Sequence, residues 1–285
     1  MRSTPPSKVF RSDLLAGKVA LVTGGGTGIG AATARELVRL GATVTIASRK
    51  ASHIEPAAAG LSAELGAEVR GLILDIRDRD SVAAAVDALM ARHGRIDLLV
   101  NNGGGQFLAP AATIQPRGWD AVVATNLTGT WNLTRAVADA SLLARGGSVV
   151  SVTMLTQRGF PGMAHSVAAR AGVEAMTRTL AVEWAPNNVR INCVAPGFVL
   201  SSGMRNYPDG ATMAAELQRQ VPQKRLLSCD EIAWAIAYLL SDAAIGVTGQ
   251  TWTVDGGATL WGNLWPVPDP DALPEVVLPV EPWER

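Results

Sequence analysis

The sequence predicts an α/β fold with a doubly wound, parallel β-sheet and helices on both faces. Two observations support this fold class. Short β-branched or apolar runs alternate with longer segments of helical apolar spacing, as in parallel βαβ units. The first apolar run also passes into a glycine-rich loop, Thr23 to Gly30, that precedes an alanine-rich helical segment. Strand, glycine loop and helix in this order are typical of a nucleotide-binding turn.

The first half of the chain alternates strand and helix three times. The apolar residues 18–22 predict a buried strand, and residues 30–40 predict a helix that Gly41 ends. Residues 43–47 predict a short β-branched strand. A helix over 57–65, a strand over 71–74, a helix over 81–93 and a strand over 98–100 are expected to follow.

The second half repeats the alternation with longer helices. A helical stretch over 119–143 leads to a strand over 148–152, and a helix over 166–184 leads to a strand over 189–194. Ser228 and Glu231 have capping-box spacing, so a helix is expected from there to Leu240. A last strand is expected over 250–254. The prolines after about Leu264 predict an extended tail.

Charge and composition exclude several classes of function. The chain of 285 residues has 25 basic and 25 acidic side chains and no basic stripe, so no nucleic-acid partner is expected. No apolar run is as long as a membrane span, so no membrane partner is expected either. Cys193 and Cys229 form no disulfide framework, and with three scattered histidines they offer no metal-ligand spacing. We therefore expect no metal site.

The terminal residues and the few cysteines predict a cytoplasmic protein. Two cysteines are typical of a reducing compartment. Residues 1–12 lack the apolar core of a signal peptide, and Trp283-Glu284-Arg285 is not a peroxisomal Ser-Lys-Leu address. We expect an N-terminal extension over 1–16, one domain over 17–260 and an extended Pro-rich tail over 261–285.

The glycine-rich loop has the properties of a diphosphate site. Gly24, Gly28 and Gly30 lack a Cβ atom, so the backbone turns tightly and approaches the ligand. The following helix presents free N–H groups and the positive end of its dipole to phosphate oxygens. A glycine-rich turn without a ligand is the alternative, but the strand before it and the helix after it favour nucleotide binding.

Five motifs occur in a recognisable order on these elements. They are the glycine loop, Asn101-Asn102-Gly103, Asn126, Pro196-Gly197 and Asp255-Gly256-Gly257. Over residues 17–260 this order resembles the short-chain dehydrogenase/reductase family. The resemblance implies a single-domain Rossmann fold, a dimer or tetramer, and hydride transfer between a nicotinamide cofactor and a carbon of a small-molecule substrate.

The resemblance also implies which residues bind the cofactor. Asn102 and Gly103 would line the adenosine side, and Pro196-Gly197 and Ser201 would enclose the nicotinamide. Asp75 would contact the adenine amino group, or alternatively form only a turn. The full set implied is Gly24, Thr27, Gly28, Ile29, Gly30, Asp75, Ile76, Asn102, Gly103, Gly104, Arg170, Pro196, Gly197, Val199 and Ser201.

The end of the second strand predicts NADP(H) as the cofactor. NAD-binding versions of this fold place an acid there, which bonds the ribose 2′-hydroxyl, whereas NADP versions supply a cation for the 2′-phosphate. Here the position is Ser48, followed by Arg49 and Lys50. An arginine holds a phosphate through two hydrogen bonds. A solvated basic pair is the alternative, but the missing acid is independent evidence.

The catalytic motif of the family is altered. Most members carry Tyr-x-x-x-Lys, where this chain has Ser166-Val-Ala-Ala-Arg170, and Thr153 stands in the place of the usual serine. Reducing a ketone makes an alkoxide that needs a positioned acid, and a serine hydroxyl is a poor one. Reducing an activated C=C bond makes an enolate, which needs hydrogen-bond donors at a carbonyl oxygen. The substitution therefore favours enoyl reduction, or loss of activity.

A closer resemblance agrees with this chemistry. The stretch from Asn101 to Leu108, the pair His165-Ser166 and the Pro-rich tail are similar to peroxisomal trans-2-enoyl-CoA reductases. The related 2,4-dienoyl-CoA reductases use a tyrosine further upstream, paired with lysine, and residues 152–157 contain none.

Roles follow from this resemblance. Arg170 would bind the nicotinamide ribose, while Ser166, Thr153 and Thr156 would donate hydrogen bonds near the thioester carbonyl. Tyr207, in the loop after the nicotinamide segment, is either the phenol that reaches the substrate or an ordinary aromatic residue of that loop.

Two further residues have open alternatives. His165 is either a proton donor or a capping residue, and Asn126 either holds a relay water or bonds backbone across a kink.

Three functions stay open at this point. The leading one is an NADPH-dependent reductase of a 2-enoyl thioester. The second is a reductase of another unsaturated carbonyl, a ketone or an imine in secondary metabolism. The third is a catalytically degraded NADP(H)-binding regulatory protein. The family also forms homo-oligomers, so the tail that begins at Trp261 and Trp265 is expected to cover a neighbour's active site.

Overall fold

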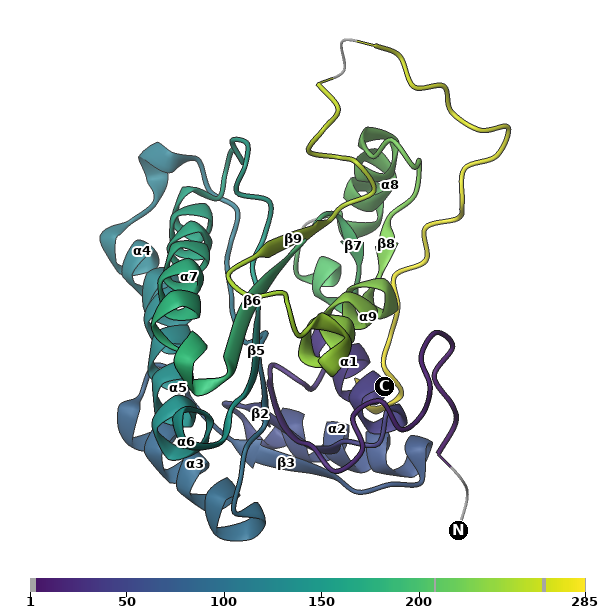
Figure 1. Ribbon diagram of the computed structural model, residues 1–285. Helices are drawn as coiled ribbons and strands as arrows, with labels where there is room; N and C mark the ends of the chain where they lie inside the picture. The colour runs from purple at the N-terminus through teal and green to yellow at the C-terminus, as the bar shows by residue number, and fades with distance from the viewer. Residues whose placement is uncertain (1–3, 208, 263–264, 285) are drawn as a thin grey trace.

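Seven parallel strands form the central sheet of the protein, in the order β3-β2-β1-β4-β5-β6-β9 (Figure 1). The computed structural model describes residues 4–207, 209–262 and 265–284; the remainder of the expected extension (1–3) and tail (263–264 and 285) lies outside the described residues. The predicted parallel α/β sheet is confirmed. Its strands are β1 (Val19–Thr23), β2 (Thr43–Ser48), β3 (Val69–Ile73), β4 (Leu98–Asn101), β5 (Gly147–Val152), β6 (Val189–Pro196) and β9 (Thr251–Val254).

The strand order reverses between β1 and β4. From β1 the chain moves outward to β2 and β3 and then returns to β4 on the other side of β1, so that Ala20 pairs with both Val44 and Leu98. The carboxyl ends of β1 and β4, at Thr23 and Asn101, therefore lie side by side. A reversal of this kind opens a crevice at the carboxyl edge of the sheet, where α/β proteins bind ligands.

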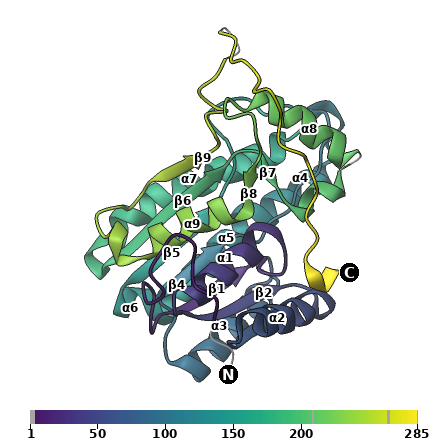
Figure 2. The ribbon, with the colours of Figure 1, turned by 90° about the vertical axis from the view of Figure 1, so that its right-hand side faces the viewer.

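Helices cover both faces of the sheet (Figures 1 and 2). One face carries α1, α2 and α9, and the other carries α3, the stretch from α4 to α6, and α7. The helices are α1 (Gly28–Arg39), α2 (Ala51–Leu65), α3 (Arg79–His93), α4 (Pro116–Val123), α5 (Gly129–Val137), α6 (Leu143–Arg145), α7 (Ala164–Glu183), α8 (Gly210–Gln220) and α9 (Cys229–Leu240).

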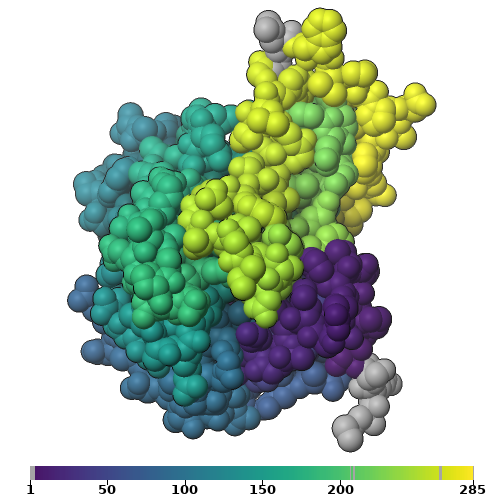
Figure 3. Space-filling model, in the orientation of Figure 1, coloured from purple at the N-terminus to yellow at the C-terminus, as the bar shows by residue number. Residues whose placement is uncertain are grey.

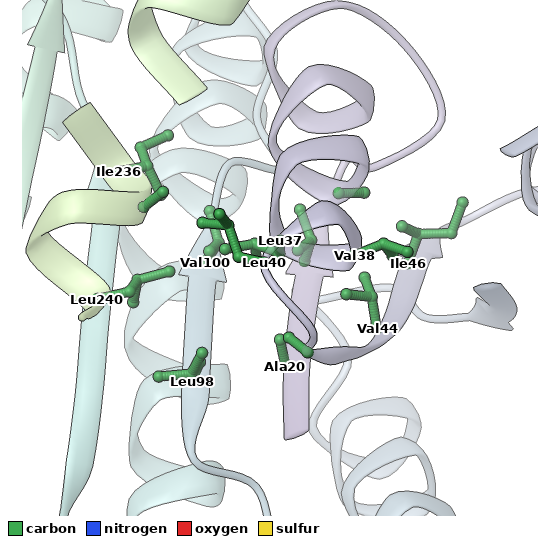
Figure 4. Packing of buried hydrophobic residues seen from close by; sticks show 14 of the residues in the cluster. Ala20, Leu37, Val38, Leu40, Val44, Ile46, Leu98, Val100, Ile236 and Leu240 are labelled. Atoms are coloured by element: carbon green, nitrogen blue, oxygen red, sulfur yellow. The ribbon is translucent and has the colours of Figure 1, made fainter. Parts of the chain in front are cut away.

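The apolar residues of α1 and α9 meet those of the sheet in one core cluster (Figure 4). Ile236 and Leu240 of α9 and Leu37 of α1 are at most 2% exposed. They face strand residues that the alternation along β1, β2 and β4 turns to the same side. Burial of these side chains fixes the amino end of α1 against the carboxyl end of β1, and this positions the glycine-rich loop.

The long helix expected over 119–143 runs from Pro116 to Arg145 and contains two π-helical segments, Ala124–Thr128 and Ala138–Leu142. A π turn inserts an extra residue into the helix and often marks a functional position. Asn126 lies in the first of these segments and is fully buried.

The segment after β6 forms a structure that the sequence did not predict. Strands β7 (Val199–Leu200) and β8 (Leu227–Ser228) pair in a small parallel sheet, and α8 lies between them. We call residues 199–207 and 209–228 the lid. The described part of the tail, 261–262 and 265–284, runs back past the lid to α2 (Figure 2). It packs on its own chain, and the expected cover of a neighbour's active site stays a prediction.

Within the described ranges, none of the helices has both the length and the apolar character needed to cross a membrane. The same residues include no group of three or more histidine, cysteine, aspartate or glutamate side chains arranged to hold a metal ion.

Candidate active site

The backbone of the glycine-rich loop favours glycine at Gly24 and Gly28 and requires it at Gly30. Gly24 and Gly28 have positive φ angles of 62° and 53°, in the left-handed region. A Cβ atom on Gly30 would overlap the carbonyl oxygen of Gly24. The sequence therefore specifies a tight turn in which α1 begins directly beside the end of β1.

The loop is tied to the end of β4. The hydroxyl of Thr23 accepts hydrogen bonds from the backbone N–H groups of Asn102 (3.1 Å) and Gly103 (2.9 Å). The side-chain amide of Asn102 donates in return to the carbonyl oxygens of Thr23 (3.0 Å) and Gly24 (3.1 Å). These bonds fix the end of β4 against the beginning of the glycine-rich loop.

The beginning of α1 has the donors that a diphosphate needs. Thr27 is the N-cap residue, and its side chain makes no capping hydrogen bond. The first intrahelical bond runs from Ala31 N–H to the carbonyl of Thr27 at 3.2 Å. The N–H groups of Gly28, Ile29 and Gly30 have no partner within the helix, and they lie at the positive end of its dipole. The residues present therefore fit a dinucleotide.

Polar side chains at the ends of β2 and β3 lie beside this loop. Arg49 and Lys50 are exposed at the start of α2, and Ser48 is half-buried. The Asp75 carboxylate accepts two hydrogen bonds from the Arg77 guanidinium, at 2.5 and 2.9 Å, and these bonds lower the pKa of Asp75. The charge of Arg49 also lowers it, so the three groups share one region.

The segment after β6 closes the crevice from the other side. Gly197 N–H donates to the carbonyl of Val254 at 2.8 Å, and a Cβ atom on Gly197 would come within 2.7 Å of Asp255. Further on, the Cβ of Ser201 lies 3.6 Å from the position that a Cβ on Gly28 would take. The structure therefore brings Ser201 to the amino end of α1.

Three other residues that the resemblance assigns to the cofactor site lie in strands or pack against protein atoms. Pro196 ends β6 and is buried, and Val199 belongs to β7. Ile76 is 8% exposed; its carbonyl accepts a hydrogen bond from Asn132 at 3.1 Å, and a Cβ on Gly129 would contact its side chain.

Arg170 is a buried cation on the inner face of α7. Its guanidinium donates to the carbonyl of Val152 at 2.7 Å and makes no ion pair with a carboxylate in the described part of the chain. Burial lowers the pKa of Arg170 to about 10, so the side chain is still positively charged at neutral pH. A Cβ atom on Gly104 would overlap this guanidinium. The guanidinium therefore packs directly against the backbone of the loop after β4.

Asn126 bonds the loop after β4 rather than only its own helix. Its Oδ1 accepts from Gly105 N–H, and its Nδ2 donates to the Gly105 carbonyl, both at 3.0 Å. This paired contact holds Gly105 against the π-helical segment between α4 and α5. The backbone-bonding role is observed, and because the amide keeps one hydrogen and one acceptor position, the relay-water role stays a prediction.

Glu174 is a site residue that the sequence did not reveal. It lies one turn after Arg170 on α7 and is 8% exposed. Its two carboxylate oxygens accept hydrogen bonds from Thr153 (3.1 Å) and Thr156 (2.9 Å). The only available signal was an acid at helical spacing from Arg170 on an alanine-rich, buried helix. The two partner threonines become its neighbours only in the folded chain.

The contacts of Glu174 change the expected role of the two threonines. A hydroxyl group has a single hydrogen to donate. Thr153 lies 3.1 Å from Glu174 and 3.4 Å from the Val194 carbonyl, so its hydrogen is used inside the protein, and that of Thr156 points to Glu174. Neither hydrogen is directed at a substrate carbonyl, contrary to expectation.

Two buried polar atoms at the start of α7 have no partner in the described part of the chain. They are Ser166 Oγ and His165 Nε2. His165 Nδ1 accepts the Ser166 N–H at 2.8 Å, which leaves the proton of a neutral ring on Nε2. The ring of Phe107 stands edge-on to the imidazole at 4.4 Å. Buried polar atoms are normally bonded, so each of these two atoms requires a partner such as a water or a polar group of a ligand.

Tyr207 lies on the lid at the edge of this region. Its hydroxyl is 3.5 Å from Gln106 Nε2, and Gln106 precedes Phe107. The Tyr207 hydroxyl therefore contacts the loop after β4, the same loop whose Phe107 packs on His165. Tyr238, by contrast, bonds the Ala243 carbonyl at 3.3 Å and stacks on a tryptophan.

Neither cysteine is prepared to act as a nucleophile. Burial raises the pKa of Cys193 and that of Cys229 to about 12. The thiolate is the reactive form, and at these values it is rare at neutral pH. The candidate chemistry therefore belongs to Ser166, His165, Arg170 and the lid.

Comparisons with known proteins agree with this geometry. A family model described as Enoyl-(Acyl carrier protein) reductase matches residues 24–259. The peroxisomal 2,4-dienoyl-CoA reductase of Rattus norvegicus is 38% identical over 260 residues, which cover 90% of this chain and 88% of that protein.

Solved structures show the same likeness. A citronellol catabolism dehydrogenase (AtuB) of Pseudomonas aeruginosa PAO1 is 41% identical, with a TM-score of 0.79, over 88% of this chain and 98% of that one. An actinorhodin polyketide ketoreductase with NADPH is 31% identical, with a TM-score of 0.81, over 86% and 98% of the two chains.

Proposed function

Because this chain belongs to the short-chain dehydrogenase/reductase family of nicotinamide-dependent oxidoreductases, we propose that it is an NADPH-dependent reductase of the C=C bond of a 2-enoyl thioester. The observation that carries the proposal is Ser166, a buried hydroxyl without a partner in the described ranges, at the position of the family's phenol. A serine hydroxyl serves an enolate oxygen better than it serves an alkoxide.

The choice of NADPH is supported by the end of β2. Ser48 gives the site no acid for a ribose 2′-hydroxyl, and the exposed Arg49 and Lys50 are positioned to bind a 2′-phosphate. The similar ketoreductase structure was determined with NADPH. The bound nicotinamide supplies the hydride for the β-carbon of the enoyl group.

The protein's own residues would stabilise the charge that develops on the substrate. As the β-carbon gains the hydride, the electron pair of the C=C bond moves toward the thioester oxygen. Ser166 Oγ–H and His165 Nε2–H have no partner in the described part of the chain and would donate to that oxygen, whereas Thr153 and Thr156 donate to Glu174. Arg170 would hold the ribose and add positive charge.

The α-carbon must then take a proton. Tyr207 is the phenol placed by the lid at the rim of the site, so we assign it as the proton donor. The rat relative is a reductase of a dienoyl-CoA, which supports an acyl thioester as substrate. We further propose that the enzyme is cytoplasmic and that it forms a homo-oligomer. Sedimentation velocity tests the oligomeric state.

Two other functions compete. Reduction of a ketone is favoured by the similarity to a ketoreductase, and a regulatory NADP(H)-binding protein by the loss of the tyrosine. NADPH oxidation with crotonyl-CoA and longer 2-enoyl-CoA esters separates them. We expect turnover with enoyl esters and at least tenfold less with the matching 3-ketoacyl ester. Tight binding of NADPH without turnover of any enoyl thioester would contradict the proposed enoyl reductase activity.

A further inference from the structure

The tail contacts the lid at Asp269, Leu278 and Pro279. The Asp269 carboxylate pairs with Lys224 at 3.0 Å, at the end of the lid. Arg205, also in the lid, donates to the carbonyl oxygens of Leu278 (3.2 Å) and Pro279. Leu278 also packs on the apolar cluster of the lid. The tail is therefore held along the outer surface of the lid (Figure 3).

The second half of the tail reaches the glycine-rich loop. Glu281 pairs with Arg35 of α1 at 3.2 Å. Trp283 donates its indole Nε1–H to the carbonyl oxygen of Gly26 at 2.8 Å. Its ring lies on α2, where a Cβ atom on Gly60 would overlap it. A residue more than 250 positions away in sequence thus bonds the centre of the loop.

Anchors on different sides hold the backbone of this loop, beginning with the Gly24 N–H, which donates to the Ala47 carbonyl of β2 at 2.8 Å. Asn102 bonds the carbonyl oxygens of Thr23 and Gly24 from the β4 side. Trp283 bonds the carbonyl oxygen of Gly26 from the α2 side. Residues 24–26 are all glycine, which loses more conformational freedom on ordering than any other residue. Each anchor therefore reduces the entropy that ligand binding must remove.

The bond at Gly26 also orients the next donor. In a trans peptide the carbonyl oxygen and the following N–H point in opposite directions. When the Gly26 oxygen faces the indole, the Thr27 N–H points away from it. This fixes one peptide plane at the entrance to α1, next to the uncapped N–H groups described above.

We propose that Trp283 is a positioning residue for the cofactor-binding loop, and that the tail prepares this loop for the diphosphate. The proposal rests on the nicotinamide cofactor assigned above. A preorganised site binds more tightly because less freedom is lost on binding. A tail that only covers apolar surface would leave cofactor affinity unchanged.

The Trp283→Phe variant tests the proposal, because it removes the N–H donor and keeps an aromatic ring. We expect the Kd for NADPH, measured by fluorescence titration, to rise about fivefold, the typical effect of one hydrogen bond. The KM for NADPH is expected to rise with it, while kcat at saturating NADPH stays unchanged. Trp265→Phe is the matched control, since Trp265 is an 80% exposed tryptophan of the same tail.

If the Trp283→Phe variant does not fold, a second variant still tests the proposal. Glu281→Gln removes the ion pair with Arg35 without touching the ring, and we expect it to raise the same Kd about twofold. If both variants bind NADPH with the Kd of the wild-type protein, the proposed role of the tail is overturned, while the cofactor assignment is unaffected. Absence of NADPH binding by the wild-type protein would instead overturn the cofactor assignment.

Discussion

The position of Arg170 depends on a single glycine. A Cβ atom on Gly104 would overlap the guanidinium and lie 2.8 Å from Asn126 Oδ1, whereas a Cβ on Gly105 would meet nothing within 4 Å. The Gly104→Ala variant should therefore displace Arg170. We expect kcat/KM for NADPH-dependent reduction to fall roughly 100-fold, the cost of about 1 Å of misplacement.

The neighbouring glycine provides the control for this prediction. Gly105→Ala retains the two backbone hydrogen bonds to Asn126, so its steady-state kinetics should stay within about twofold of wild type. Thermal unfolding of both variants checks that each is folded. Equal activity in the two variants would show that Arg170 has no role in the reaction.

Tyr207 can be tested in the same way. If its phenol supplies the proton, Tyr207→Phe should lower kcat with an enoyl-CoA about 100-fold, which is typical of general acid catalysis, and leave the Kd for NADPH unchanged. Tyr238→Phe is the control, because that hydroxyl bonds only the Ala243 carbonyl. Full activity of Tyr207→Phe would indicate that water, or another group, protonates the α-carbon.

At the level of elements, the start of α9 is an ionisable cap. Ser228 and Glu231 form the predicted capping box, with the Ser228 N–H donating to Glu231 at 2.8 Å and the Glu231 N–H to Ser228 at 3.2 Å. Arg225 also bonds the Glu231 carboxylate, at 2.7 and 2.8 Å. These bonds, that from Arg225 foremost, lower the pKa of Glu231 below its ordinary value of 4.5.

A folded-state pKa below the unfolded value means that the carboxylate stabilises the fold above pH 4.5 and that this contribution is lost as the pH falls through the folded value. At pH 7 the free energy of unfolding of the wild-type protein should therefore exceed that of Glu231→Gln by about 1 kcal/mol, which corresponds to roughly 2 °C in Tm. The difference should shrink below pH 4.5. The Tm of Glu183→Gln, exposed near the end of α7, should follow wild type. A constant difference across pH would contradict the prediction.

At the level of the whole molecule, the crevice joins segments from both halves of the chain. The loop after β1, the loop after β4, α7 and the segment after β6 all meet there. A ligand bound among them stabilises only the folded state. At about 100 times its Kd, NADPH should add ~2.7 kcal/mol to the free energy of unfolding, or roughly 5 °C in Tm.

The same measurement with NADH tests the choice of cofactor. At equal concentration NADH should raise the Tm by less, because it lacks the phosphate that Arg49 and Lys50 would bind. An equal shift with both nucleotides would contradict the NADP(H) assignment, and no shift with either would contradict the crevice as the cofactor site.

Much of the fold could be predicted because its signals are local. Apolar runs, glycines and the capping box at Ser228 act over a few residues, and the strands they predict differ from the observed ones by one or two residues at most ends. The glycine loop is local too, since positive φ at Gly24 and Gly28 is a property of the backbone itself.

Contacts between distant segments were decided by the tertiary structure alone. Glu174 meets Thr153 and Thr156 only after α7 packs on β5, and this contact removes two expected donors from the site. Trp283 meets Gly26 only because the tail folds back on its own chain. Hydrogen-bond partners depend on which surfaces are buried together, and no local pattern records that. The sequence by itself determined the family, the sheet and the diphosphate loop; packing decided which side chains are left free to act in the crevice.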